Sequence, residues 1–305
     1  MYDLIILGAG PAGLAASVYA SRYKIKHLVI GNVFDGSLAK AHLIENWPGE
    51  KSIKGADLVM KFYEHAKSFG AEITQEKIIK VDKSNKEFIV KTSLNKIYTS
   101  KTILIALGTK HRKLNISGEE EFLGKGVSYC VVCDGAFFKD KITAVVGGGN
   151  SAAMAAEMLS EYASKVYVIY RKHLMRCEPL ILDRLKKNSK IEIIHDTNVL
   201  KVSGNKKIEF IEIDNKYNGS DKIKLDGLFI EVGSVPAINF VRKLEAETDK
   251  SNYIIIDQGG ATNVAGVYAA GDITSGSNNL HQIVTAVSEG AIAATSIYGY
   301  LKKGK

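Results

Sequence analysis

The chain has 305 residues, which is enough for two domains of ordinary size, each with its own hydrophobic core. Hydrophobic residues make up 46% of it, charged residues 24%, and there are only 4 prolines, which excludes a disordered or low-complexity protein. Three cysteines are too few, and odd in number, for a secreted disulfide framework. Because Asp3 stands where a signal peptide carries positive charge, we expect a cytoplasmic protein.

The net charge of +8 raises the question of a nucleic-acid partner. Many of the lysines lie in residues 77–101, where they are interleaved with strand-like apolar residues. This pattern favours a solvated basic hairpin over a nucleic-acid surface, and an acidic protein partner stays an alternative.

The first predicted unit is a strand, a glycine turn and a helix in "YDLIILGAGPAGLAASVYASR". The turn interrupts the first apolar run, so it favours a folded domain over a membrane span. Gly8, Gly10 and Gly13 have the spacing of a turn that cradles a dinucleotide pyrophosphate. The next strand, "KHLVIGN", ends at Gly31 and Asn32, where an acid would normally bind the ribose of NAD, so a plain NAD site is weakened.

The stretch "SYCVVCDGAFF" places Cys130 and Cys133 three residues apart. A zinc site would need two more ligands at short spacing, but Cys177 is isolated and no two of the seven histidines are close in sequence. A structural disulfide is disfavoured in a reducing cytosol. A redox dithiol therefore remains, and a helix beginning here would favour a thiolate. Asp134 adjoins the pair and can carry a proton.

The second fingerprint is "KITAVVGGGNSAAMAAEMLSEY", with Gly147, Gly149 and Ala152 in the same spacing. A strand ends at Tyr170, and the basic residues Arg171, Lys172 and Arg176 follow. Arg171 stands 19 residues after Ala152, about where the ribose is contacted. Cations at this position suit a 2′-phosphate, so the pattern predicts NADPH over NADH.

Near the C-terminus, a strand leads to Gly271 and Asp272 and then to a long helix of small residues. An acid at a strand end can bind a polyol hydroxyl, and the start of the helix can face an anionic ring edge.

Six motifs, in this order, resemble the low-molecular-weight, prokaryotic-type thioredoxin reductases of the FAD/NAD(P)-linked pyridine nucleotide-disulfide oxidoreductase family. They are "GAGPAG", "ENWPG", "CVVCDG", "GGGNSA", "YRKHLMR" and "AAGD". The resemblance extends from residue 5 to about residue 300.

The resemblance implies an α/β fold with two Rossmann-like domains. An FAD domain formed by residues 1–112 and 240–305 would contain an inserted NADPH domain of residues 113–239 that carries the cysteines. Each would be a parallel sheet with helices plus an antiparallel β meander. The family also implies a homodimer and a domain rotation during turnover. From the residue patterns above we expect no metal, no nucleic acid and no membrane partner.

The resemblance also assigns residues to the two cofactors. For FAD these are Gly8, Gly10, Pro11, Ala12, Gly13, Gly36, Ser37, Leu38, Asn46, Ala106, Gly108, Gly271, Asp272, His281, Gln282 and Ile283. For NADPH they are Gly147, Gly149, Asn150, Ser151, Ala152, Arg171, Lys172 and Arg176.

The implied reaction passes a hydride from NADPH to the flavin, and electrons from the flavin to a Cys130–Cys133 disulfide. Thiol–disulfide exchange with a thioredoxin or glutaredoxin-like protein follows. By analogy, Cys133 faces the flavin, Cys130 attacks the partner and Asp134 manages the proton.

The sequence departs from the family in places that concern the electron donor. Met154 and Ala155 stand where acidic residues are usual, and His281 replaces an arginine. A ferredoxin-type donor and a dithiol oxidase are therefore the enzymatic alternatives, and a non-catalytic redox sensor is the alternative from another class. The basic residues after the second fingerprint favour NADPH.

Overall fold

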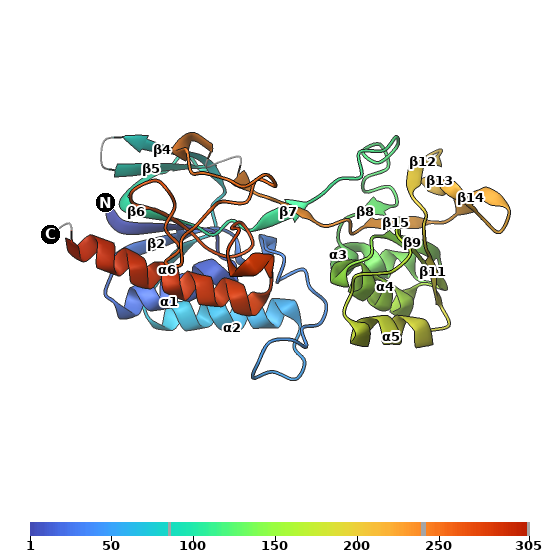
Figure 1. Ribbon diagram of the computed structural model, residues 1–305, viewed down its shortest axis with the longest axis horizontal. Helices are drawn as coiled ribbons and strands as arrows, with labels where there is room; N and C mark the ends of the chain where they lie inside the picture. Colours follow the sequence, from blue (N-terminus) through green and yellow to red (C-terminus); the bar gives the residue numbers. More distant parts are fainter. Residues whose placement is uncertain (85–86, 239–241, 304–305) are drawn as a thin grey trace. The chain divides into compact units, whose positions relative to one another are not determined.

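The computed structural model describes residues 1–84, 87–238 and 242–303, and the chain divides into two compact units (Figure 1). Unit 1 is Met1–Lys110 with Val235–Lys305, and unit 2 is His111–Ser234. The chain passes between them through β7 (Thr109–His111) and β16 (Ser234–Pro236), which pair as a two-stranded ribbon. The predicted boundary between residues 239 and 240 lies outside the described residues, as does the turn of the basic hairpin at 85–86.

Unit 1 is built on a sheet of seven strands, counted over its described residues, in the order β3-β2-β1-β6-β5-β4 with β17 beside β6. The strands are β1 (Tyr2–Leu7), β2 (His27–Ile30), β3 (Glu72–Thr74), β4 (Ile78–Ser84), β5 (Glu87–Thr92), β6 (Ile97–Ile105) and β17 (Val267–Ala269). Strands β1, β2, β3, β6 and β17 run parallel, whereas β4, β5 and β6 form an antiparallel meander.

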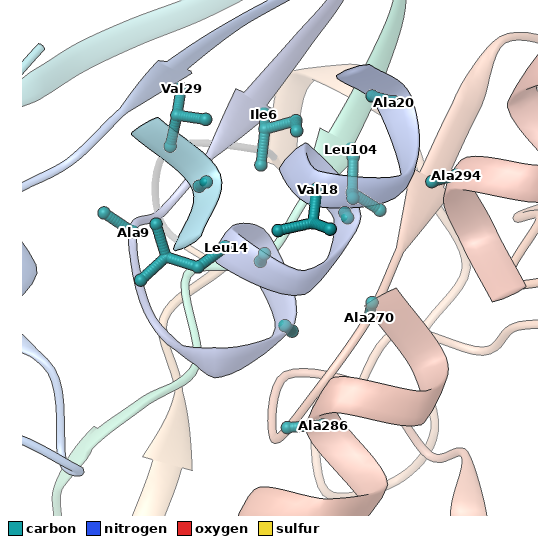
Figure 2. Close-up of a cluster of buried hydrophobic side chains, with 14 of the residues drawn as sticks. Ile6, Ala9, Leu14, Val18, Ala20, Val29, Leu104, Ala270, Ala286 and Ala294 are labelled. Atoms are coloured by element: carbon teal, nitrogen blue, oxygen red, sulfur yellow. The ribbon is translucent and has the colours of Figure 1, made fainter. Parts of the chain in front are cut away.

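Helices α1 (Pro11–Arg22), α2 (Gly55–Ser68) and α6 (Ile283–Lys303) cover one face of this sheet (Figure 1). Strand residues alternate between the two faces. Leu4 and Ile6 therefore pack against the helices, whereas Ile5 and Leu7 pack against the opposite face. Figure 2 shows Ile6 in the cluster on the helix side. The described part of this unit also contains the 3₁₀ turns η1 (Val33–Asp35), η4 (Arg242–Leu244) and η5 (Ser277–Asn279).

Unit 2 contains a parallel sheet in the order β11-β10-β9-β15-β8. Its strands are β8 (Val127–Ser128), β9 (Ile142–Val146), β10 (Lys165–Ile169), β11 (Ile191–Ile194) and β15 (Gly227–Ile230). The order changes direction between β9 and β15, and such a switch point is where open α/β sheets bind ligands.

The two faces of this sheet are covered differently. Helices α3 (Val131–Asp134), α4 (Asn150–Tyr162) and α5 (Pro179–Lys187), with the turn η2 (Gly135–Phe138), lie on one face. An antiparallel meander of β12 (Val199–Gly204), β13 (Ile208–Tyr217) and β14 (Ser220–Lys224) packs on the other. The predicted α/β class, with a parallel sheet and an antiparallel meander in each part, is confirmed. No helix in the described parts of the chain is long and apolar enough to cross a membrane.

Candidate functional site

The first glycine turn joins β1 to α1 in unit 1. Gly8 has φ +112°, and a Cβ there would lie 2.2 Å from the carbonyl oxygen of Ala106. A Cβ on Gly13 would lie 1.9 Å from the carbonyl oxygen of Gly8, so only glycine fits at this position. Gly10 precedes Pro11 as the N-cap of α1, and a Cβ there would meet nothing within 4 Å. The turn thus leaves open space at the helix N-terminus, which fits a pyrophosphate.

The second glycine turn joins β9 to α4 in unit 2 and repeats this design. Gly147 has φ +147°, and its Cβ would lie 2.2 Å from the carbonyl oxygen of Glu231. Gly149 is the N-cap of α4 and again faces open space. The ring of Tyr170 lies where a side chain at Gly148 would be, 2.3 Å from the position of its Cβ. Ser151 and Ala152, both predicted to contact the nucleotide, lie in the first turn of α4.

The loop after β10 is tied to this second turn. The amide of Arg176 donates to the carbonyl oxygen of Gly148 at 2.6 Å. The side chain of Asn150 donates to Glu178 Oε1 and accepts from the Glu178 amide, both at 2.8 Å. The cationic side chains of this loop are exposed, and they are Arg171, Lys172 and Arg176. The predicted phosphate turn and the predicted 2′-phosphate cations therefore lie at the same edge of the sheet.

Glu289 of α6 holds the loop at Gly271 and Asp272 in place through hydrogen bonds. Glu289 accepts the Gly271 amide at 2.8 Å, the Thr274 hydroxyl at 3.0 Å and the Ser277 hydroxyl at 2.5 Å. Burial raises the pKa of the Asp272 carboxyl, His281 opposes this rise, and Glu289 adds to it. The sequence does not indicate Glu289, because only the folded loop shows that three donors bind its carboxylate.

A Cβ on Gly271 would lie 3.0 Å from that of Ala12, so this loop adjoins the first glycine turn. Asn46 Nδ2 donates to Gln282 Oε1 at 3.0 Å across 236 residues of sequence. His281 packs against Tyr253, with ring centroids 4.9 Å apart, and its buried Nε2 has no hydrogen-bond partner among the described residues. A buried ring nitrogen without a described partner, on a residue that interacts with Asp272, fits contact with a bound cofactor.

The other residues predicted to contact FAD also lie in unit 1. Ala106 and Gly108 follow the carboxyl end of β6, and Ile283 begins α6. Gly36 ends η1, and Ser37 and Leu38 come next along the chain. Leu38 belongs to the buried cluster that also contains Ala12.

The cysteine pair forms a disulfide with 5.3 Å between its Cα atoms. Cys130 is the N-cap of the short helix α3, and its Sγ accepts the Cys133 amide at 3.2 Å. Cys133 is exposed and Cys130 is half-buried. The third cysteine, Cys177, is free and buried, and burial raises the pKa of its thiol, which keeps it protonated and unreactive.

The acid next to the pair is also held in place. The Ser128 hydroxyl donates to Asp134 Oδ2 at 2.5 Å, and the Cys130 amide donates to Ser128 Oγ at 3.0 Å. The sequence pattern indicates Asp134 but not Ser128, although Ser128 opens the same motif.

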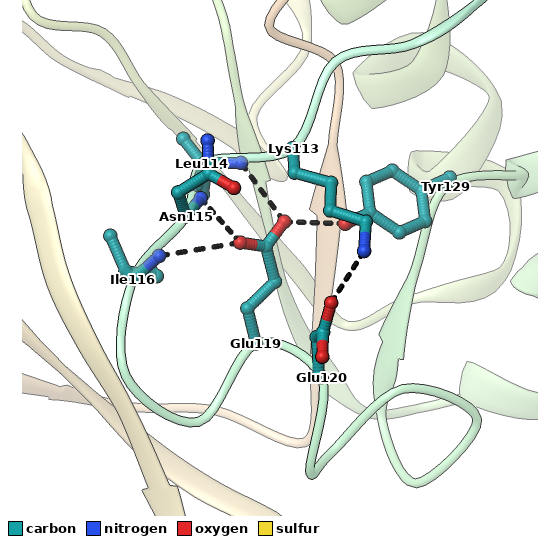
Figure 3. A network of polar contacts seen from close by, with 7 residues as sticks. All are labelled: Lys113, Leu114, Asn115, Ile116, Glu119, Glu120 and Tyr129. Carbon is teal, nitrogen blue, oxygen red and sulfur yellow. Dashed lines mark hydrogen bonds and ion pairs between the residues drawn. The ribbon is translucent and has the colours of Figure 1, made fainter. Parts of the chain in front are cut away.

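The strand end before Cys130 is anchored by Glu119 (Figure 3). Its carboxylate accepts the Leu114 and Asn115 amides at 2.9 and 2.6 Å, together with the hydroxyl of Tyr129. Burial and this bond raise the pKa of Tyr129, so the phenol stays a donor. The segment after β7 and the residue before Cys130 are thereby fixed to each other within unit 2.

A further acid lies beside the second glycine turn. Glu231 follows β15, and its amide donates to the carbonyl oxygen of Val146 at 2.9 Å. Burial raises the pKa of its carboxyl to about 7. It was missed because a strand-like run such as "GLFIEVG" does not reveal which side chain is buried.

Comparison with known proteins places the whole chain in one group. Residues 2–290 match the family model described as pyridine nucleotide-disulphide oxidoreductase. A thioredoxin reductase from Listeria innocua is 41% identical over 308 residues, covering 100% of this chain and 95% of the relative. One from Bacillus subtilis is 39% identical and covers 99% and 96%. The crystal structure of Lactococcus lactis thioredoxin reductase has a TM-score of 0.94 at 36% identity and covers 99% of this chain and 100% of that one. The chain therefore belongs to the pyridine nucleotide-disulphide oxidoreductase family and, within it, to the thioredoxin reductases.

Proposed function

We propose that this enzyme reduces the disulfide of a thioredoxin with electrons that pass from NADPH through FAD to the Cys130–Cys133 pair. The cofactors are those of the family, FAD and NADPH. The observation that carries the proposal is an accessible disulfide with an adjacent acid, on a unit that also carries a dinucleotide turn. A structural disulfide would need neither of these neighbours.

FAD is assigned to unit 1. Its pyrophosphate would lie over Gly10 at the start of α1, where a side chain would meet open space. Asp272 would bind a polyol hydroxyl, and His281 and Gln282 would face the ring system. Bound there, FAD supplies the two-electron step between the nicotinamide and the disulfide.

NADPH is assigned to unit 2. Its pyrophosphate would lie over Gly149, and the loop tied back by Arg176 would bring Arg171 and Lys172 to the 2′-phosphate. Guanidinium groups bind phosphate through charge-assisted, forked hydrogen bonds, which NADH cannot form at that position.

The cysteines then pass the electrons to the partner. Two electrons and two protons convert the Cys130–Cys133 disulfide into two thiols. The thiolate of Cys130 attacks the partner disulfide, and Cys133 then attacks the mixed disulfide, which releases the partner with two thiols. Asp134 takes the proton from the thiol that attacks second. The enzyme disulfide is restored and the proton count is unchanged.

The surroundings of the dithiol suit a protein substrate. Val132, between the cysteines, is 43% exposed, and Phe137, four residues after Cys133, is 81% exposed. Such apolar side chains beside a reactive group favour docking of a partner with an apolar rim around its own disulfide.

The proposed function is tested by following NADPH oxidation in the presence of thioredoxin. We expect turnover in the wild type, none in Cys133→Ser, and unchanged turnover in the matched control Cys177→Ser. Absence of thioredoxin-dependent NADPH oxidation by the flavin-loaded wild type would overturn the proposal.

We also propose a cytoplasmic homodimer. Support for a dimer comes from aromatic side chains at the ends of α1 and α2, where Tyr19 and Phe69 are 41% and 44% exposed and Arg22 lies over the Phe69 ring. Light scattering should give twice the chain mass, and a monomer at micromolar concentration would contradict the dimer.

A further inference from the structure

Ser128 is held in place by the parallel sheet of unit 2 and not by the loop that carries the cysteines. It is the last residue of β8, where it pairs with Phe229 of β15, and it is 5% exposed. The position of its main chain is therefore determined by strand pairing. Its hydroxyl can then form hydrogen bonds with the redox loop, residues 130–134.

The Ser128 hydroxyl joins the two ends of the redox loop. At the start of the loop it accepts the Cys130 amide at 3.0 Å. At the end of the loop it donates to Asp134 Oδ2 at 2.5 Å, whereas the carbonyl oxygen of Cys130 lies farther away, at 3.4 Å. The single hydroxyl proton therefore goes to the carboxylate, in a short charge-assisted hydrogen bond.

We propose that Ser128 is a positioning residue for Asp134, holding the carboxylate where it exchanges a proton with the Cys130–Cys133 pair. This inference rests on the proposed function of Asp134 as the proton carrier. Because Ser128 bonds Oδ2, the proposal assigns the proton exchange with the thiol to Oδ1.

The chemistry requires such an arrangement at one step. When the first thiolate has formed a mixed disulfide, the second thiol must lose its proton before its sulfur can break that bond. The new S–S bond forms within the loop, the old one releases a thiolate, and the carboxylate holds the proton. A carboxylate free to rotate would spend less time in reach of the thiol.

The experiment isolates this step without NADPH or thioredoxin. The full chain is reduced with dithiothreitol, freed of reductant and mixed anaerobically with 4,4′-dithiodipyridine. The first thiopyridone is released by attack of one thiol on the reagent, at a rate that depends on reagent concentration. The second is released when the other thiol closes the enzyme disulfide, at a rate that does not.

The variants are Ser128→Ala, Ser128→Thr, Asp134→Asn and the double variant Ser128→Ala with Asp134→Asn. The control is Ser160→Ala, since Ser160 is another buried hydroxyl of unit 2, 7% exposed, that donates to the carbonyl oxygen of Glu157.

We expect Ser128→Ala to slow the second release by about 10- to 150-fold, the factor that corresponds to one hydrogen bond to a charged group. The first release should change less than about twofold, Ser128→Thr should restore the wild-type rate, and Ser160→Ala should not alter it. In the Asp134→Asn background, Ser128→Ala should slow the second release almost no further, because the carboxylate through which Ser128 acts is already absent.

Two results would overturn the inference: an unchanged second release in Ser128→Ala, or an equal slowing by Ser128→Ala in the Asp134→Asn background. If the methyl group of Ser128→Thr does not fit, the comparison of single and double variants still decides. Wild-type protein assayed in parallel with NADPH and thioredoxin tests the proposed function separately, since its failure there would leave the dithiol result intact.

Discussion

The two cysteines of the redox loop have different surroundings although only two residues separate them. Cys130 is half-buried and its sulfur accepts an amide hydrogen bond, whereas Cys133 is exposed. We predict that Cys133→Ser leaves flavin reduction by NADPH intact but abolishes thioredoxin reduction, because a single thiol cannot re-form the enzyme disulfide. Stopped-flow spectroscopy of the flavin and a thioredoxin assay measure the two halves, and retained thioredoxin reduction would refute this relay.

The proposed preference for NADPH over NADH also depends on single side chains. We predict that Arg171→Ala raises the KM for NADPH far more than that for NADH. Losing hydrogen bonds to a phosphate should cost on the order of 1.5–3 kcal/mol, or about 10- to 150-fold. Steady-state kinetics with both coenzymes measure this ratio. Equal effects of Arg171→Ala on both coenzymes would argue against a 2′-phosphate contact.

At the scale of elements, each strand–turn–helix unit contains one glycine that the fold requires and, two residues later, one that leaves space for the proposed phosphate. We predict that Gly147→Ala destabilises unit 2, because φ is +147° and the new Cβ would lie 2.2 Å from a backbone oxygen. Gly149→Ala should fold normally, since its Cβ meets nothing, yet bind NADPH at least about tenfold more weakly because a methyl group would occupy the phosphate approach. Thermal unfolding and nucleotide titration distinguish the two, and equal loss of stability in both would contradict the design.

These elements were also the part that the sequence could predict. Glycine spacing specifies a turn because it reports a backbone requirement that is local, and this is why the folds around Gly8 and Gly147 were foreseeable. Ser128, Glu119 and Glu289 were not, because each acts through partners brought close by folding and each residue type is common at surfaces. Asn46 and Gln282 were assigned to FAD only through the family resemblance, and their contact was not predicted, since no local pattern links residues 236 positions apart.

At the scale of the whole molecule, a buried acid links the stability of unit 1 to pH. Glu76 is 6% exposed and accepts hydrogen bonds from Lys96, Thr92, Thr74 and Tyr98. The bond from Lys96, followed by that from Thr92, lowers its pKa from 4.5 to about 2. A lowered pKa stabilises the fold above the unfolded value, and this stabilisation is lost as the pH falls from about 4.5 towards 2.

We therefore predict that Glu76→Gln lowers the free energy of unfolding at pH 7 by about 1–3 kcal/mol. The difference from wild type should shrink as the pH falls below about 4.5. Urea unfolding from pH 7 to pH 3 measures it, with the exposed Glu121→Gln as the control. A difference that stays constant or grows on acidification would contradict the role of the ionised carboxylate.

The central proposal involves both units: electrons enter from NADPH at unit 2 and reach a flavin held by unit 1. The most direct measurement is an anaerobic titration of the flavin-loaded protein with NADPH and, separately, with NADH, following the visible absorption of the flavin. We predict rapid bleaching by NADPH and little by NADH at the same concentration. No bleaching by NADPH, with dithionite still reducing the flavin, would contradict the claim and direct the search to a ferredoxin-type donor or to the dithiol-oxidase direction.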